Sequence, residues 1–331
     1  TGVETGKMPA NAEQIKFKLN NLRIEGVTVF NSGELESLYQ NLLGKEVALA
    51  DIYNVAEKIT AYYGQQGYML VRAFVPPQTI DAGQVTIKVI EGYLDEVRVE
   101  GLDDLNASFF EYHRELLINS KPLHSKDLER FLLLANDLPG IRFKSVLNPS
   151  ETNVGAATLV MTATKTPWQG LVSLDNRGSE SSGPWQLLVE GTANNLFGRY
   201  DSTTLRYATV PNDTDELQYW QLSHFQVLTS EGLKLGIDIN RTDSEPDGDV
   251  YRLLDVETRG RSETISLSYP VIRSREENLT VGGLFSFRES DTLQLGLLST
   301  RDKLRVLRLS ATYDTADASG GGGVSLFSAT L

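Results

Sequence analysis

The pattern of apolar and polar residues changes its period near Pro167. Before this residue, segments with a helical period lie between segments that alternate, whereas only alternation remains after it. Residues 168–175 alternate, a turn rich in Ser and Gly ends at Gly183, and a second alternating run follows in Trp185, Leu187 and Val189. Two such runs around a short turn predict an antiparallel hairpin. The chain is therefore expected to divide into α+β modules and an all-β part.

Residues 16–92 predict one small α+β module. Strand-like runs occupy 17–24, 27–30, 68–75 and 84–90. Two helices between the second and third runs are indicated by apolar residues at helical spacing, namely Leu35, Leu38, Tyr39 and Leu42 in the first and Ile52, Val55, Ile59 and Tyr62 in the second. The order of elements is strand, helix, helix, strand, strand. Residues 1–15 are polar and predict a flexible lead-in to this module.

The same order of elements recurs in residues 93–166. A strand is predicted at 94–100, helices begin at Ser108 and Ser125, and strands follow at 141–147 and 157–164. A repeat of about 75 residues is a stronger signal than any single element. Each module is expected to bury one face of its sheet under two helices.

Residues 167–331 predict long strands joined as consecutive hairpins. The clearest run places Leu233, Leu235, Ile237 and Ile239 on one face and Lys234, Gly236, Asp238 and Asn240 on the other. Further alternating runs lie at 264–271, 279–288 and 307–313, whereas the faces are mixed between 217 and 228. We expect about eight strands and part of a ninth. Because the sequence ends within a strand at Leu331, either the chain is truncated or its open edge closes against another molecule.

Alternation alone fits both a membrane barrel and a soluble β-sandwich. Strands of about ten residues favour a tilted membrane span, because sandwich strands average about half that length. The face opposite the apolar one carries charged residues, as a water-filled lumen would: Arg206, Lys234, Asp238 and Arg288. The chain has no run of 18 apolar residues, which excludes a helical span.

Composition and residue spacing argue against several classes of function. The net charge of −13 and the lack of a Lys/Arg-rich run do not fit nucleic-acid binding. There is no cysteine, and His113, His124 and His224 have no metal-ligand spacing. No Ser/His/Asp arrangement is spaced for catalysis. We therefore expect no catalytic residue, no metal site and no cofactor, and the chain is not expected to be an enzyme.

Three segments together resemble a known family: the junctions 89–93 and 162–168, and the first hairpin of the all-β part with the turn after it. The motif of this hairpin comprises Asp175, Asn176, Gly178, Gly183, Asn195, Gly198 and Asp201. The chain resembles the two-partner secretion transporters of the haemolysin-activator type, within the Omp85 superfamily. The resemblance implies POTRA domain 1 at 16–92, POTRA domain 2 at 93–166, and the N-terminal part of an antiparallel transmembrane β-barrel at 167–331. The family's plug helix, its Val-Arg-Gly-Tyr/Phe loop motif and the second half of its barrel are not found.

The resemblance also implies a function and a location. Such a protein lies in the outer membrane of a Gram-negative bacterium as a monomeric, porin-like barrel, with its POTRA domains in the periplasm. Its partners are outer-membrane lipid and one large secreted exoprotein, which it recognises unfolded and exports without ATP. Two alternatives remain: an inserter or foldase of outer-membrane proteins, and a soluble β-sandwich binding protein with adaptor modules.

The strand at 68–75 is the candidate docking edge for the exoprotein. Pro76-Pro77 follows it, and proline tends to mark the edge of a sheet because it cannot donate to a ladder. An extended client could pair with such an edge. The candidate contact residues are Tyr68, Leu70, Val71, Ala73, Phe74 and Val75. The alternative is that these side chains only fill the core of the module.

Overall fold

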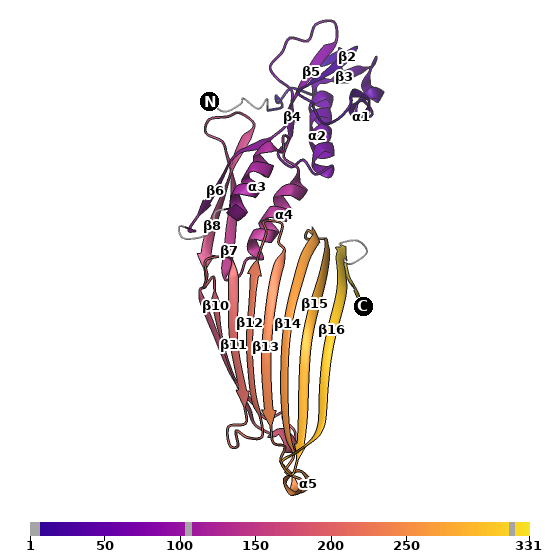
Figure 1. The fold of residues 1–331 in the computed structure, drawn as a ribbon. Helices are drawn as coiled ribbons and strands as arrows, with labels where there is room; N and C mark the ends of the chain where they lie inside the picture. Colours follow the sequence, from indigo (N-terminus) through magenta and orange to yellow (C-terminus); the bar gives the residue numbers. More distant parts are fainter. Residues whose placement is uncertain (1–6, 103–107, 318–321) are drawn as a thin grey trace. The chain divides into compact units, whose positions relative to one another are not determined.

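The computed structural model describes residues 7–102, 108–317 and 322–331 (Figure 1). The chain separates into two compact units, one of residues 1–100, 111–131 and 144–162, and the other of residues 101–110, 132–143 and 163–331. None of the helices within the described residues is both long and apolar enough to cross a membrane.

The first module contains a three-stranded sheet in the order β2-β5-β4 and a small two-stranded sheet, β1-β3. Strand β2 is parallel to β5, and β4 is antiparallel to it. The elements are β1 (Lys16–Lys18), β2 (Asn21–Glu25), α1 (Ser32–Glu36), the 3₁₀ turn η1 (Gln40–Leu42), β3 (Glu46–Ala48), α2 (Leu49–Gln65), β4 (Arg72–Phe74) and β5 (Gln84–Ile90).

Helix α2 supplies most of the core of this module. Ile52, Val55 and Ile59 are buried on the predicted stripe. The fourth predicted residue, Tyr62, is only half-buried, and its neighbour Tyr63 is fully buried instead. The helix begins where the Asp51 carboxylate accepts a hydrogen bond of 2.9 Å from the backbone N–H of Ala48, which satisfies one free donor of the first turn.

Other predicted elements of the first module are shorter than expected. The strand predicted at 17–24 divides into β1 and β2, because Leu19 and Asn20 donate their backbone N–H groups to Lys45 and Gly83 instead of continuing one ladder. Residues 27–30 form no strand, and the strand predicted at 68–75 is reduced to β4. Strand β3 was not predicted.

The first predicted helix is also shorter, since α1 ends at Glu36 and three-residue turns follow. Leu38 donates its N–H to Leu35 at 3.1 Å, and Tyr39 donates to Glu36 at 3.0 Å. The four predicted apolar residues still reach the core, with Leu35 buried and the other three packed against it. The lead-in contacts the module too, because Ala12 is buried and accepts a hydrogen bond from Ala50. Residues 1–6 lie outside the described residues.

The second module has the predicted order of strand, helix, helix, strand, strand. It consists of β6 (Tyr93–Glu100), α3 (Ser108–Asn119), α4 (Ser125–Asn136), β7 (Ile141–Pro149) and β8 (Ala156–Lys165), with its sheet in the order β6-β8-β7. His113 is buried, and its ring lies 4.9 Å from that of Phe131. This histidine is therefore a core residue.

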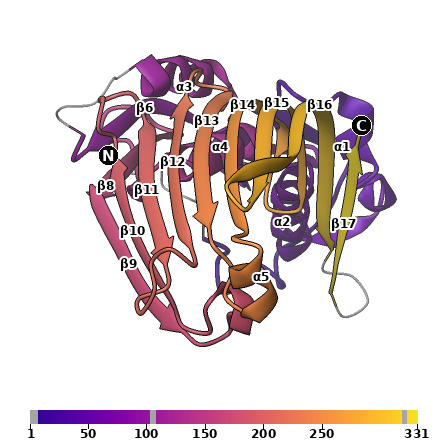
Figure 2. The same cartoon turned by 60° about the horizontal axis from the view of Figure 1, so that its bottom comes forward.

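The all-β part is one antiparallel sheet in which each strand pairs with its neighbours in sequence, from β9 at one edge to β17 at the other. Figure 2 shows that this sheet is curved. Its strands are β9 (Trp168–Asp175), β10 (Gln186–Asn194), β11 (Asp201–Thr209), β12 (Gln218–Val227), β13 (Lys234–Ser244), β14 (Glu257–Arg273), β15 (Glu277–Gln294), β16 (Leu297–Asp317) and β17 (Gly323–Thr330). The sheet is not closed, and β12 occupies the stretch whose faces were mixed in the sequence.

Candidate docking edge and barrel surfaces

Strand β4 lies at an edge of its sheet, next to β5. Its register places Ala73 opposite Val89 and Phe74 opposite Lys88, so Pro76 would stand opposite Thr86. Pro76 has no N–H to donate to Thr86. The side-chain amide of Gln78 pairs with the backbone of Thr86 instead, donating to its carbonyl at 2.7 Å and accepting from its N–H at 2.8 Å. The backbone of β4 therefore leaves the ladder at the two prolines.

The six candidate docking residues divide into two groups. Val71, Ala73 and Val75 are buried in the core, and Tyr68, Leu70 and Phe74 are half-buried. Met69, which is not one of the six, is 61% exposed. The buried group cannot meet a client through its side chains. Any client contact would involve the backbone of β4 and the half-buried group.

The outer N–H group of Ala73 already has a partner. It donates a hydrogen bond of 2.9 Å to the hydroxyl of Thr60 on α2, and this hydroxyl donates to the carbonyl of Ala56 at 3.1 Å. An incoming strand would have to displace Thr60 to use this donor. The sequence carries no signal for this contact, because a Thr inside a helix normally bonds within its own helix.

Glu91, near the end of the first module, connects the segment at Thr28 to helix α2 through hydrogen bonds. Its carboxylate accepts hydrogen bonds from the backbone N–H of Thr28 at 2.8 Å, from the Thr28 hydroxyl, and from the hydroxyl of Tyr63 at 2.6 Å. Burial opposes the charge of Glu91, but these hydrogen bonds outweigh it and hold the pKa of the carboxyl below its usual range. Burial and the bond to Glu91 raise the pKa of Tyr63. The junction at residue 91 is thus a structural site.

Strand β6 is an edge of the second sheet and borders a groove of about 310 Å³ beside α3. Arg114 of α3 donates a hydrogen bond of 3.2 Å to the backbone carbonyl of Val97 and an ion-paired one of 2.7 Å to Glu111. Side chains from α3 thus occupy part of this edge, as Thr60 does at β4.

The residues of the first-hairpin motif lie at opposite ends of β10. Asp175, Asn176, Gly178 and Gly183 belong to the β9–β10 turn, where the Asp175 carboxylate accepts the N–H of Arg177 at 3.0 Å. A side chain on Gly178 would meet the carbonyl of Gly183, so the close approach of the two backbones requires glycine there. Asn195, Gly198 and Asp201 belong to the β10–β11 turn. The motif therefore shapes two separate turns.

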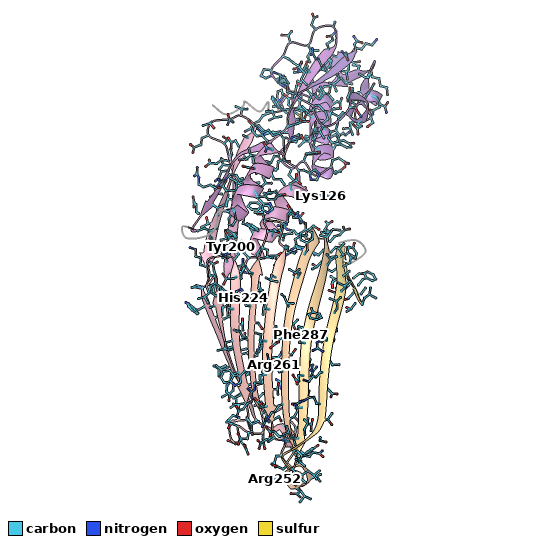
Figure 3. All side chains as sticks on the ribbon, viewed as in Figure 1. Lys126, Tyr200, His224, Arg252, Arg261 and Phe287 are labelled. Atoms are coloured by element: carbon cyan, nitrogen blue, oxygen red, sulfur yellow. The ribbon has the colours of Figure 1, made fainter. Side chains whose placement is uncertain are left out.

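The β10–β11 turn is held by the buried carboxylate of Asp201, which accepts the N–H of Phe197 at 3.1 Å and that of Arg199 at 3.3 Å. Asn195 accepts the N–H of Tyr200 at 2.9 Å. Figure 3 labels Tyr200, whose buried ring lies 5.8 Å from that of Phe109. Burial raises the pKa of Tyr200 to about 12, so this tyrosine is neutral at physiological pH.

Neighbouring contacts link the same turn to the segment after α4. Asn194 donates a side-chain hydrogen bond of 2.9 Å to the carbonyl of Thr166, and Thr166 donates its N–H to Gly140 at 2.7 Å. A side chain on Gly140 would overlap that of Asn194. The motif and its neighbours therefore form a packed joint at this end of the sheet.

The cross-strand register separates two faces of the large sheet. The polar face carries the four predicted lumen residues. Two of them have polar cross-strand partners, since Arg206 donates to Glu190 at 2.6 Å and Asp238 accepts from Gln221 at 2.6 Å. Lys234 stands opposite Val227 and Ser268, and Arg288 stands opposite Ser262 and Leu304. The apolar face carries Leu235, Ile237 and Ile239 as predicted, and the last two are 41% and 42% exposed. Within the described residues, no group of three or more His, Cys, Asp or Glu is placed to hold a metal ion.

Comparison with known proteins agrees with this architecture. Residues 17–92 match the POTRA domain of the ShlB type, and residues 157–316 match the family of haemolysin secretion/activation proteins ShlB/FhaC/HecB.

Two curated relatives and one solved structure show how much of the chain is shared. The heme/hemopexin transporter protein HuxB of Haemophilus influenzae is 26% identical over 94% of this chain and 55% of its own length. The outer membrane transporter CdiB of Dickeya dadantii is 24% identical over 90% of this chain and 53% of its own. The structure of CdiB from Escherichia coli superposes with a TM-score of 0.73 at 20% identity, over 99% of this chain and 62% of that one. The chain spans about half the length of the curated relatives. It belongs to the ShlB-type two-partner secretion transporters of the outer membrane.

Proposed function

We propose that the nine strands form part of the wall of an outer-membrane pore through which one large exoprotein leaves the cell unfolded. The observation that carries this proposal is the division of the sheet into an apolar face and a polar face. An apolar face suits lipid, and a polar face suits a water-filled lumen. Folding of the client outside the cell would prevent its return.

The two modules would receive the client in the periplasm. A strand edge binds an extended peptide through its backbone, so it accepts many sequences. We place the first contact at β4, with Tyr68, Leu70 and Phe74 beside the added strand and Val71, Ala73 and Val75 supporting it from the core. Displacement of Thr60 from the Ala73 N–H would open the edge, because the hydroxyl and the client compete for one donor. One copy of the protein would form one pore.

Export in cells tests this function. The full-length protein is expressed with the large secreted protein whose gene neighbours its own, and the exoprotein is measured in the medium. We expect export to stop when the transporter is removed, while the abundance of other outer-membrane proteins stays constant. A general fall in outer-membrane proteins would identify an inserter or foldase instead. Solubility of the full-length protein without detergent would identify a soluble sandwich.

A further inference from the structure

The apolar face of strands β13–β16 changes from apolar to charged residues along each strand. Residues of this face that stand opposite each other form cross-strand rows. Two neighbouring rows are apolar: Leu235, Leu267, Gly283 and Leu309, and then Ile237, Ile265, Phe285 and Leu307. The following row is mixed, with Ile239, Glu263, Phe287 and Arg305. Two charged rows come next: Arg241, Arg261, Glu289 and Lys303, and then Asp243, Arg259, Asp291 and Arg301.

Aromatic residues stand where the apolar face ends. Phe287 is the last apolar residue of this face on β15 before Glu289. On β11 and β12, the facing residues Tyr207 and Trp220 stand one row further along, in the row of Arg241 and Glu289, with ring centroids 4.2 Å apart. Aromatic residues of this kind are typical of the boundary between lipid and water. We take this boundary to lie at the level of lipid headgroups.

The boundary is basic although the whole chain is acidic. The mixed and charged rows hold six basic and four acidic side chains, whereas the chain has a net charge of −13. Most of the basic groups are paired: Lys303 with Glu289 at 2.8 Å and Arg301 with Asp291 at 2.7 Å are examples. Arg305 is different. Its guanidinium lies 5.8 Å from the centre of the Phe287 ring, and none of the carboxylates in the described residues is within ion-pair distance of it.

A groove in the apolar face lies next to Arg305. It has a volume of about 500 Å³ and is lined by Leu267, Gly283, Phe285, Leu307 and Leu309 among others. The floor is open because Gly283 has no side chain between Leu267 and Leu309. Residues two apart on a strand share a face and lie about 7 Å from each other. On this face of β16, Arg305 is therefore the next residue after Leu307, and Lys303 lies about 7 Å beyond Arg305.

We propose that this groove and the basic pair Lys303 and Arg305 bind one phosphorylated lipid of the outer leaflet. An acyl chain would lie in the groove at Gly283, and a phosphate would accept hydrogen bonds from Arg305 and Lys303. The turn at 274–276 joins β14 to β15 at one end of the sheet, where Arg273 pairs with Asp137. The charged rows lie toward the other end of these two strands. The choice of the outer leaflet rests on the proposed function, which places the modules in the periplasm. Figure 3 labels Arg261 and Phe287, which flank the site on β14 and β15.

Lipid retention tests the proposal without requiring export. The full-length protein in detergent is mixed with phosphatidylcholine and either bisphosphorylated lipid A or its dephosphorylated form, repurified, and assayed by mass spectrometry for bound lipid. We expect preferential retention of the phosphorylated form. Lys303→Gln with Arg305→Gln, which removes two charged donors, should lower its retention about tenfold. Gly283→Leu should lower retention of both forms, because it fills the groove while keeping the charges.

Arg308→Gln is the matched control, because Arg308 lies on β16 but faces the other side of the sheet. Its retention of lipid A should equal that of the parent protein. Folding of every variant is checked by the heat-dependent shift in gel mobility, and Arg305→Lys, which keeps the charge, should retain most of the binding. Equal retention of the two lipid A forms would overturn the proposal. The proposal would also be overturned if Arg308→Gln lost as much lipid A retention as the double variant, or if inorganic phosphate fully displaced the bound lipid A. Export could fail without affecting any of these results.

Discussion

Asp137 and Arg273 form a two-pronged ion pair between residues 136 positions apart in the sequence. The Nε of Arg273 lies 2.7 Å from one carboxylate oxygen of Asp137, and its Nη2 lies 2.8 Å from the other. Asp137 follows α4, and Arg273 is the last residue of β14. About 70% or more of each side chain is buried. The ion pair therefore adds to the packed contacts that Tyr200 and Asn194 make at the same end of the sheet.

Arg273→Gln should destabilise the folded protein by about 1–3 kcal/mol, because it leaves a partly buried carboxylate without its charged partner. The free energy of unfolding is measured by reversible unfolding in detergent. Arg241→Gln is the control, since 67% of the Arg241 side chain is exposed in its ion pair with Asp243, and it should cost less than about 1 kcal/mol. Equal costs for the two variants would show that the joint does not depend on this pair.

Neither partner of this pair could be chosen from the sequence. Asp137 looks like an ordinary residue after a helix, and Arg273 like one at a strand end, so only the tertiary fold makes them neighbours. The core stripe of α2 was largely predictable, because Ile52, Val55 and Ile59 repeat at helical spacing. Strand β12 was not, because large residues lie on both of its faces: Trp220 and Leu222 on one, and Tyr219 and Phe225 on the other. Similarly, β4 was predicted too long because apolar residues continue past the point where the ladder ends.

Residues 17–164, cut out of the chain, should form a folded and soluble pair of modules. The first module has its own core under α2, and the second repeats its order of elements. Circular dichroism should show mixed helix and strand content, with cooperative loss on heating. A disordered fragment would refute the assignment of the modules.

Acid should weaken this fragment through Glu91. The pKa of Glu91 is lowered by folding, so its contribution to stability is complete above the unfolded pKa of about 4.3 and is lost as the pH falls through the lower folded value. Glu91→Gln should cost about 1–3 kcal/mol at pH 7 and reduce the loss of stability between pH 5 and pH 3. Glu57→Gln, an exposed change on α2, should leave both quantities unchanged. An unaltered pH dependence in Glu91→Gln would contradict the role given to this carboxylate.

Leu235→Arg should destabilise the sheet by about 2–4 kcal/mol if this position faces the middle of a bilayer. The cost is measured by reversible unfolding in lipid. Asn240→Arg, on the polar face of the same strand, is the control and should cost far less, because its side chain meets water. A cost-free Leu235→Arg would count against a membrane barrel.

Two variants of the β4 edge separate docking from folding. Ala73→Pro removes the outer N–H and should weaken binding of a secretion-signal fragment. Thr60→Val removes only the hydroxyl that occupies this donor, so client binding should be maintained or strengthened. Both are measured by titration of the fragment onto folded protein. If both variants bind as tightly as the parent, β4 is not the docking edge.

Transport into vesicles measures whether the protein alone moves an exoprotein across a membrane. The full-length protein is reconstituted into liposomes with its modules facing outward, unfolded exoprotein is added outside without ATP, and the fraction protected from added protease is measured. We expect protected exoprotein in these vesicles and none in vesicles lacking the protein, with protection reduced in Ala73→Pro. Complete digestion of the exoprotein in every vesicle, with the pore shown to be folded and open, would contradict the proposed function.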